Sequence, residues 1–487
     1  MLFFSINPIY FILSVLCGGM IGLIFIPAHR FQTLRVWSLG CSCLVFLYSL
    51  FMWASFNSGS SKFQWATETV WAATSNFSVP LGVDGISLFY ILLTTLLFPI
   101  CLLASWHSVT RQVKEYLFAF LLMETLLVMV FSVLDLLLFY ILFETILLPM
   151  FFVIGLWGAR QRKIRAAYLF FLYTLVGSLL LLVGILYIYV KVGTTHYLSL
   201  LNVEWTPLEE KLLWGAFFLS FATKVPMFPF HLWLPEAHVE APTAGSVLLA
   251  GILLKLGTYG FLRFSLPLFP YASLYFTPFV HTLALMGVVY TSLTAIRQTD
   301  LKRIIAYSSV AHMSLVVMGL FGNQPCAVEG ALLQSLSHGF VSSALFLLVG
   351  VVYDRFHTRT IQYYGGLAQV MPIYVTLFLF FTLGNIGFPG TSAFVGEFLL
   401  LFGLFQTNPA ACFFGATGMI LGGGYALWLF NRVCYGNSGN LPVTGLTDLT
   451  QREMVTLIPL ALGSLWMGLY PEPFLEVLRS GLYVFVL

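Results

Sequence analysis

Long apolar runs dominate this sequence and restrict its fold more than any other feature. Fourteen such runs, most of about 20 residues, are separated by charged or Pro/Gly-rich breaks, and each could cross a bilayer as a helix. Of the 487 residues, 59% are hydrophobic and only 8% are charged. A water-soluble fold could not bury so much apolar surface, and a membrane β-barrel would show shorter, alternating segments. The sequence therefore predicts an all-α polytopic membrane protein.

The predicted spans follow from the positions of these runs. They cover residues 9–27, 36–54, 86–106, 115–133, 136–156, 167–190, 211–233, 244–265, 275–296, 304–321, 330–352, 372–406, 411–434 and 454–470. The twelfth run is too long for one straight helix and contains Gly384, Gly387, Pro389 and Gly390, so we expect one broken helix there. The first run has no basic n-region and no small-residue cleavage site, so we expect a spanning helix and not a cleaved signal or transit peptide.

Basic residues are distributed unequally between the two sides that these spans define. One side holds fifteen, namely Arg30, Arg35, Arg111, Lys114, Arg160, Arg162, Lys163, Arg165, Arg297, Lys302, Arg303, Arg355, Arg359, Arg432 and Arg452. The other holds Lys62, Lys191, Lys211, Arg263 and Arg479. Such an asymmetry favours an even number of spans, with both termini on the outer side. We interpret the basic run GARQRKIR as a solvated topology signal with some lipid headgroup contact.

Two interrupted spans indicate a weak internal symmetry. The seventh breaks at Pro226 and Pro229 beside Lys224, and the twelfth breaks at Pro389 near Glu397. Broken helices at matching positions, five spans apart, are typical of inverted repeats with sites near the bilayer midplane. We predict helices 1–3 in residues 1–114, a first half with helices 4–8 in 115–270, a second half with helices 9–13 in 271–436, and helix 14 with a tail in 437–487.

The charged residues Glu144, Lys224 and Lys255 lie well inside predicted spans, where a charge costs roughly 2.5 to 3.5 kcal/mol at the centre. We expect Glu144 to pair with Lys224, and interpret the pair as one whose opening and closing changes the proton affinity of the lysine. The alternative is a static ion pair that fixes helix packing. Lys255 lies between Gly251 and Gly257, too deep to snorkel easily, and is predicted to carry a proton.

Further titratable residues extend this series. Histidine titrates near neutral pH, so His312 and His338 are candidates for a proton shuttle, although a lone buried histidine is as often a packed, hydrogen-bonded residue. Glu397 follows the second helix break, where an unwound segment admits water to a carboxylate. Glu124 is a further candidate relay residue with less context.

The segment HLWLPEAHVEAPT contains His231, Glu236, His238 and Glu240 at the end of the seventh span. It has no HExxH spacing and its prolines break any single helical face, so a proton entry funnel or a structural turn is favoured over a metal site. The seven cysteines show no CxxC spacing, and the chain has no GxGxxG or P-loop motif. We therefore expect no metal, no cofactor and, with a net charge of only +3, no nucleic acid.

Four segments closely resemble a known family. FATKVPMFPFHLWLPEAHVEAPTAGSVLLAGILLKLGTYGFLRFSLPLFP, DLKRIIAYSSVAHMSLV, LSHGFVSSALFLLVGVVYDR and PGTSAFVGEF are similar to the chain 4 family of proton-pumping NADH:ubiquinone oxidoreductase, respiratory complex I, in its mitochondrially encoded form. The likeness runs from about Leu81 to Pro471. That family is related to Mrp-type cation/proton antiporter subunits, and the resemblance implies fourteen helices in two inverted five-helix units with helices seven and twelve discontinuous.

The resemblance also implies roles for individual residues. It makes Glu144 and Lys224 the coupling pair and Lys255 the central proton site. It makes His312 and His338 the connecting relay and Glu397 the outlet-side site. The glutamate at position 397 resembles chain 4, because the related chains 2 and 5 resemble sequences with a lysine at this position.

These observations lead to an expected function. We expect a multi-pass subunit of the mitochondrial inner membrane that moves protons, driven by electron transfer from NADH to ubiquinone in other subunits. Its expected partners are the other membrane-arm subunits, in particular the antiporter-like chains 2 and 5, together with lipid. The alternatives are an Mrp-type Na⁺/H⁺ antiporter subunit and a passive spacer in the membrane arm.

Overall fold

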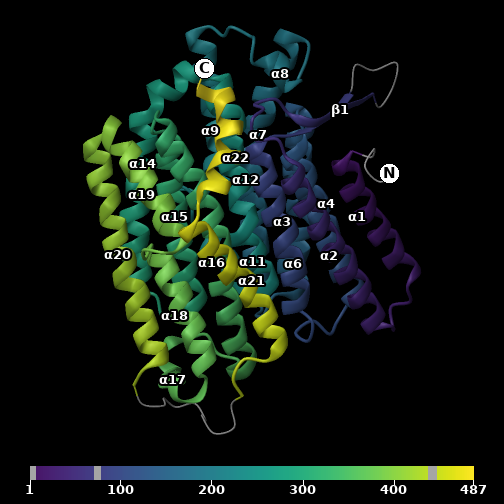
Figure 1. The fold of residues 1–487 in the computed structure, drawn as a ribbon, viewed down its shortest axis with the longest axis vertical. Helices are drawn as coiled ribbons and strands as arrows, with labels where there is room; N and C mark the ends of the chain where they lie inside the picture. Colours follow the sequence, from purple (N-terminus) through teal and green to yellow (C-terminus); the bar gives the residue numbers. More distant parts are fainter. Residues whose placement is uncertain (1–6, 71–77, 437–446, 487) are drawn as a thin grey trace. The chain divides into compact units, whose positions relative to one another are not determined.

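Helices make up nearly all the regular structure of the computed structural model, which describes residues 7–70, 78–436 and 447–486 (Figure 1). The described residues form two compact units. Unit 1 comprises those within residues 1–221, 259–273 and 476–487, and unit 2 those within 222–258 and 274–475. The prediction of an all-α polytopic membrane protein is confirmed.

Unit 1 contains the N-terminal helices, which pack side by side as α1 on α2 and α4, and α3 on α2 and α4. Its elements are α1 (Pro8–Phe25), α2 (Phe31–Ser55), β1 (Gln64–Val70), β2 (Ser78–Val83), α3 (Gly85–Ala104), α4 (Val113–Ser132), α5 (Leu136–Thr145), α6 (Leu147–Trp157), α7 (Lys163–Val192), α8 (Tyr197–Leu200), the π-helical η3 (Phe261–Ser265) and α13 (Leu266–Leu268).

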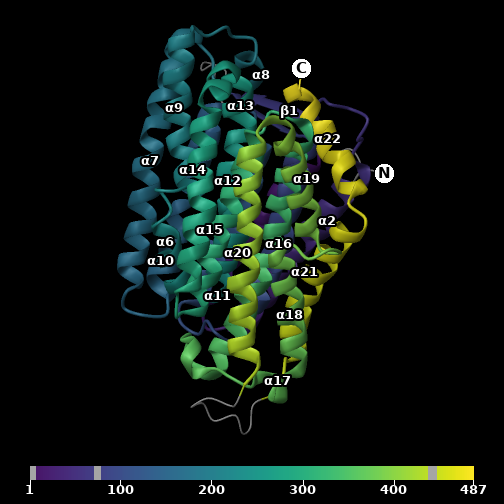
Figure 2. The ribbon, with the colours of Figure 1, turned by 90° about the vertical axis from the view of Figure 1, so that its left-hand side faces the viewer.

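Unit 2 is built around α16, which packs against α15, α18, α19 and α21. Figure 2 shows α15, α16, α19 and α20 running side by side. The elements are α10 (Trp233–Glu240), α11 (Thr243–Leu248), the π-helical η2 (Leu249–Leu253), α15 (Leu301–Leu320), α16 (Pro325–Phe356), η4 (Ile361–Tyr363), α17 (Leu367–Val370), α18 (Pro372–Ile386), α19 (Ser392–Thr407), α20 (Pro409–Cys434) and α21 (Gln451–Leu469).

Four helices continue from one unit into the other along the chain. They are α9 (Pro207–Lys224), α12 (Leu254–Gly260), α14 (Pro270–Ile296) and α22 (Glu472–Val486). These two units differ from the four predicted segments, and the predicted division into four segments stays a prediction.

Aspartates fix the starts of three helices. Asp84 accepts a hydrogen bond from the Ser87 amide at the start of α3, and Asp135 accepts one from the Leu138 amide at the start of α5. Asp300 does the same for α15. A side-chain oxygen at this position satisfies one of the amides that a helix N-terminus leaves without an internal partner. The starts of these helices are therefore set by polar residues that lie just before the apolar runs.

The predicted break in the twelfth span is confirmed. Helix α18 ends at Ile386 and α19 starts at Ser392. Gly387 and Gly390 both adopt positive φ angles, +78° and +92°, which glycine tolerates best. The amide of Phe388 donates to the Leu383 carbonyl at 3.0 Å, which closes the C-terminal turn of α18. The break in the seventh span is also confirmed, because α9 ends at Lys224 and α10 begins only at Trp233.

Two further interruptions were not predicted. The fifth span is divided into α5 and α6 at Ile146, because Pro149 has no amide to donate to the carbonyl four residues earlier. The eighth span contains the two π-helical segments η2 and η3 on either side of α12. A π segment holds one residue more per turn than an α-helix, and hydropathy does not distinguish the two.

Within the described residues, eleven helices are long and apolar enough to cross a membrane, or twelve if α21 and the start of α22 form one bent span. The predicted spans outside these twelve are the two broken ones. The pieces α18 and α19 of the twelfth span are shorter, and α9 of the seventh has 18 residues but is not apolar enough. The total of fourteen therefore stays a prediction.

A small hairpin adds an element that the sequence did not predict. β1 and β2 pair antiparallel, with Thr67 opposite Leu81 and an irregularity between Gln64 and Thr67. The hairpin lies between two predicted spans, and its residues do not alternate strongly between apolar and polar. A search for long apolar runs therefore does not find it.

Candidate functional site: a buried polar line in unit 2

Helix α16 carries the centre of the candidate site. Gln334 and His338 are four residues apart, so their side chains lie on one face of this helix. Both are buried, at 1% and 4% exposure. Together with Lys255, His312 and Glu397 they form what we call the polar line, whose members come from α12, α15, α16 and α19.

Lys255 occupies one end of the polar line and is fully buried. Its Nζ donates to the Ala250 carbonyl at 2.5 Å and lies 2.8 Å from Nδ1 of His338. Ala250 lies in η2, where the wider π turn displaces carbonyls from the regular α-helical hydrogen-bond ladder. The π segment therefore supplies a carbonyl partner for the ammonium and directs it to the imidazole. A hydrogen bond between two groups that both titrate is suited to proton exchange.

Glu397 occupies the other end. Its Oε1 accepts a hydrogen bond from Nε2 of Gln334 at 2.8 Å and lies 3.4 Å from Nδ1 of His312, an ion pair when the imidazole is protonated. The rings of His312 and His338 are 6.1 Å apart between centroids. Each step along the line therefore joins neighbouring polar side chains.

Two glycines make room for the carboxylate. A Cβ on Gly387 would lie 2.5 Å from Oε2 of Glu397, so the helix break leaves the space that this side chain fills. A Cβ on Gly396 would lie 2.7 Å from the backbone nitrogen of Gln334, so this glycine lets α19 approach α16 closely. The broken helix thus positions the acid as well as exposing backbone.

The structure places the remaining predicted charges elsewhere. Glu144 lies in unit 1, half-buried at the end of α5, next to the division at Ile146. Lys224 is the last residue of α9 and belongs to unit 2, with 4% exposure. Their pairing stays a prediction. Glu124 on α4 is fully buried, and among the described residues neither of its carboxylate oxygens has a hydrogen-bond partner.

The side chains of the HLWLPEAHVEAPT segment contact different partners. The ring of His231 stacks on Phe228 at 5.6 Å, and that of His238 stacks on Phe346 at 4.6 Å. Glu236 forms an ion pair of 2.7 Å with Arg303. Glu240 is buried at 2% exposure. These contacts fit the structural-turn interpretation, and a role in proton entry stays a prediction for His231 and His238.

Two basic residues that the sequence counted on the basic side of the membrane are buried, which the sequence did not predict. Lys302 is 2% exposed and donates to the Ala241 carbonyl at 2.9 Å. Arg359 is 1% exposed and donates to the Val239 carbonyl. Both cations satisfy carbonyls at the C-terminal end of α10, where a helix lacks internal partners and its dipole favours positive charge.

Gln334 is the member of the polar line that the sequence did not predict. The signal was available, since it precedes His338 by four residues in an apolar helix. This spacing alone does not reveal the role of Gln334, because its partner Glu397 is 63 positions away on another helix.

Comparison with known proteins gives consistent results over almost the whole chain. The family model described as "NADH:quinone oxidoreductase/Mrp antiporter, TM" matches residues 133–422. The chain is 55% identical to NADH-ubiquinone oxidoreductase chain 4 of Marchantia polymorpha, with 96% of this chain and 94% of that one covered.

Solved structures show the same fold. A chain of respiratory complex I from Thermus thermophilus superposes with a TM-score of 0.88 at 29% identity, and the match covers 98% of this chain and 99% of that one. A chain of the Mrp complex from Dietzia sp. gives a TM-score of 0.83 at 21% identity, covering 97% of this chain and 52% of that one. At that identity the second match is evidence for the fold alone.

Proposed function

Because this chain belongs to the NADH-ubiquinone oxidoreductase chain 4 family, we propose that it moves protons across the membrane along the polar line of unit 2. It is a multi-pass subunit of the H⁺-translocating NADH:ubiquinone reductase of the mitochondrial inner membrane. Its partners are other subunits of complex I. We further propose that the antiporter-like chains 2 and 5 are its neighbours in the membrane arm.

The contact between Lys255 and His338 carries this proposal. The ammonium donates to a ring nitrogen 2.8 Å away inside a fully buried environment, so its proton can pass to the imidazole without crossing apolar side chains. His312 then accepts it, either after ring reorientation or through a bridging water molecule, and passes it to Glu397 at 3.4 Å. The direction of transfer is from the centre of the bilayer toward the second helix break.

An external drive is needed for this movement. Moving one charge against 100 mV costs about 2.3 kcal/mol, and the polar line by itself only lowers the barrier. We propose that Glu144 and Lys224 supply the coupling, since a change in their pairing alters the charge felt by the lysine and, through it, the proton affinity of the next group. The drive itself comes from quinone reduction in other subunits.

Replacing His338 by glutamine tests the path. Glutamine keeps a hydrogen-bonding side chain but does not titrate, so we expect NADH-driven proton uptake in sealed vesicles to fall by at least about tenfold. His281→Gln on α14 is the matched control, because His281 is equally buried but lies outside the polar line. If His338→Gln assembles and pumps at the unaltered proton-to-electron ratio, the chain acts as a passive spacer.

An Mrp-type antiporter subunit is the second candidate, favoured by the shared fold. The native assembly distinguishes the two. A complex that co-purifies with flavin and iron–sulfur subunits supports the proposal, whereas sodium/proton exchange by a complex that lacks them would exclude it.

A further inference from the structure

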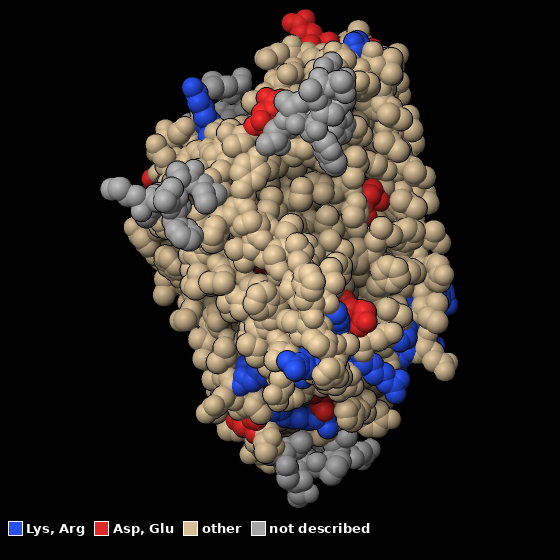
Figure 3. Space-filling model, turned by 90° about the vertical axis from the view of Figure 1, so that its right-hand side faces the viewer, with Lys and Arg blue, Asp and Glu red and all other residues tan. Residues whose placement is uncertain are grey.

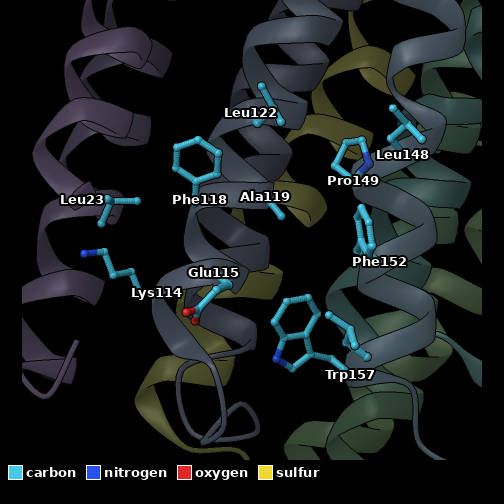
Figure 4. A pocket seen from close by; sticks show the side chains of 11 residues that line it. Leu23, Lys114, Glu115, Phe118, Ala119, Leu122, Leu148, Pro149, Phe152 and Trp157 are labelled. Carbon is cyan, nitrogen blue, oxygen red and sulfur yellow. The ribbon is translucent and has the colours of Figure 1, made fainter.

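A groove in unit 1 lies on helices that the polar line does not use. It has a volume of about 420 Å³ and is formed by α1, α4 and α6. Figure 4 shows Leu23 on one side, Phe118 and Leu122 on the central helix, and Phe152 and Trp157 on the other side. Its walls are apolar along most of their length, and Lys114 and Glu115 lie toward one end.

The groove is lined by helices that are candidate membrane spans. α1, α4 and the run of α5 and α6 are candidate membrane spans, and Phe152 and Leu156 are about half exposed along the groove. Water cannot fill such a space, because it would find few polar partners. An empty groove would forfeit dispersion contacts along its walls. A flexible apolar chain is therefore the occupant that the walls favour.

The charged end of the groove gives selectivity. Nζ of Lys114 donates to the carbonyls of Ile24 and Ile26 at 2.8 and 3.0 Å, which holds the ammonium at the end of α1 and leaves it one further N–H. The indole of Trp157 donates to the Arg111 carbonyl at 2.9 Å. The backbone of Arg111 therefore lies beside Trp157, and its side chain is exposed near this end of the groove.

More positive charge follows directly in the chain, because Arg160 and Arg162 are exposed after Trp157. On one face of the molecule, Figure 3 shows lysine and arginine side chains gathered toward one end, with uncharged side chains covering most of the rest. A basic region at the membrane surface beside an apolar groove is the arrangement that binds anionic lipid headgroups.

We propose that this groove binds one acyl chain of an anionic phospholipid, whose phosphate lies against Lys114 and Arg111. Tails gain little in leaving the bilayer for a protein surface that is equally apolar, so the headgroup contacts decide which lipid is bound. Glu115 opposes the binding, because its carboxylate lines the same end. This proposal does not depend on the proposed proton path.

Photolabelling of the intact complex tests the proposal. The complex is reconstituted in phosphatidylcholine vesicles that contain phosphatidylglycerol with a photoreactive acyl chain, and labelled peptides are identified by mass spectrometry. We expect labelling of the peptides with Phe118 and Phe152 at least about five-fold above that by phosphatidylcholine carrying the same photoreactive chain.

Variants separate the chain site from the headgroup site. Ala119→Trp fills the groove and is expected to abolish labelling by both probes. Arg111→Gln is expected to lower phosphatidylglycerol labelling about five-fold, and Glu115→Gln to raise it. Arg432→Gln, an exposed arginine at the end of α20, is the matched control and should change nothing.

Three results would overturn the proposal. Equal labelling by both probes would remove the anionic selectivity. Undiminished labelling in an assembled Ala119→Trp complex would remove the groove. Cross-linking of the groove residues to a peptide of another subunit, in place of lipid, would identify a protein as the occupant.

Discussion

Gln334 binds the acid at the Glu397 end of the polar line. It sits on α16 one turn before His338 and donates to Glu397 at 2.8 Å, so one helix face serves both the histidine and the acid. A hydrogen bond to a charged group contributes more to stability than one between neutral groups. The amide therefore holds the carboxylate in place without taking up a proton itself.

Gln334→Leu removes this donor while keeping a similar volume. We expect a loss of about 1.5 to 3 kcal/mol of stability if the carboxylate is ionised, together with reduced proton pumping. Thermal unfolding of the purified complex and vesicle acidification measure the two effects. Gln298→Leu is the control, because Gln298 follows α14, is only partly buried and contacts no member of the polar line, so its loss should change stability by less than about 0.5 kcal/mol. Equal effects of both substitutions would contradict the role of Gln334.

Glu209 lies at the start of α9, outside the predicted seventh span, and is a carboxylate that stays ionised at ordinary pH. Its carboxylate accepts hydrogen bonds from Lys191 at 2.6 Å, from Tyr187 and from Thr206. The Lys191 contact and the two neighbouring donors lower the pKa of Glu209 to about 2. Any stability that depends on its ionised form is complete above the ordinary carboxyl pKa and is lost only as the pH falls through about 2.

Glu209→Gln should therefore leave the pH dependence of proton pumping unchanged between about pH 5 and 9, since Glu209 does not titrate there. The pH profile of NADH-driven acidification, measured beside the His338→Gln profile, provides the check. A displaced profile for Glu209→Gln would mean that this surface carboxylate takes part in proton transfer.

At the scale of elements, the break between α18 and α19 combines two requirements. Both Gly387 and Gly390 need positive φ angles, but only Gly387 faces the carboxylate of Glu397. The two glycines therefore separate the effect of backbone strain from the effect on the acid.

Gly387→Ala and Gly390→Ala form a matched pair. A residue with a Cβ pays about 1 to 2 kcal/mol in this conformation, so both variants should lose stability by about that amount. A Cβ at position 387 would also lie 2.5 Å from Oε2 of Glu397, whereas at position 390 nothing lies within 4 Å. We expect only Gly387→Ala to lower pumping, as measured by vesicle acidification relative to NADH oxidation. Equal pumping by both variants would show that the space beside Glu397 does not matter.

The sequence predicted the elements whose signals are local. The broken helices were indicated by Pro226, Pro389 and the glycines around position 387. The spans were indicated by the apolar runs. It did not predict the π segments, because Leu249–Leu253 has the same hydropathy in either helix type. Nor did it predict the burial of Lys302, whose carbonyl partner at Ala241 is 61 positions away. Long-range pairing is what hydropathy and motif spacing leave out.

For the whole molecule, the chemistry of the polar line bears on which ion moves. Lys255, His338 and His312 offer nitrogen atoms, and a lysine carries its own positive charge. Na⁺ is a hard cation that is bound by clusters of oxygen ligands. Oxygen ligands are supplied only at the Glu397 end, so the proposed path suits protons better than Na⁺.

Proton pumping by the intact complex should therefore be independent of sodium. We expect the same rate of vesicle acidification when sodium salts are replaced by choline salts, and no uptake of radioactive sodium coupled to NADH oxidation. Sodium-dependent acidification would favour the antiporter alternative over the proposed function.

The π segment η2 has a consequence for how relatives of this chain should be compared. Because this turn holds one residue more than an α-helical turn, deleting one residue from Leu249–Leu253 would restore the regular α-helical hydrogen-bond ladder and remove the Ala250 carbonyl as a partner of Lys255. Such a chain would retain every ionisable side chain in an alignment and still lack this contact. The number of residues in this turn is therefore a feature to compare between relatives, because a gap there would change the surroundings of Lys255 without replacing any ionisable residue.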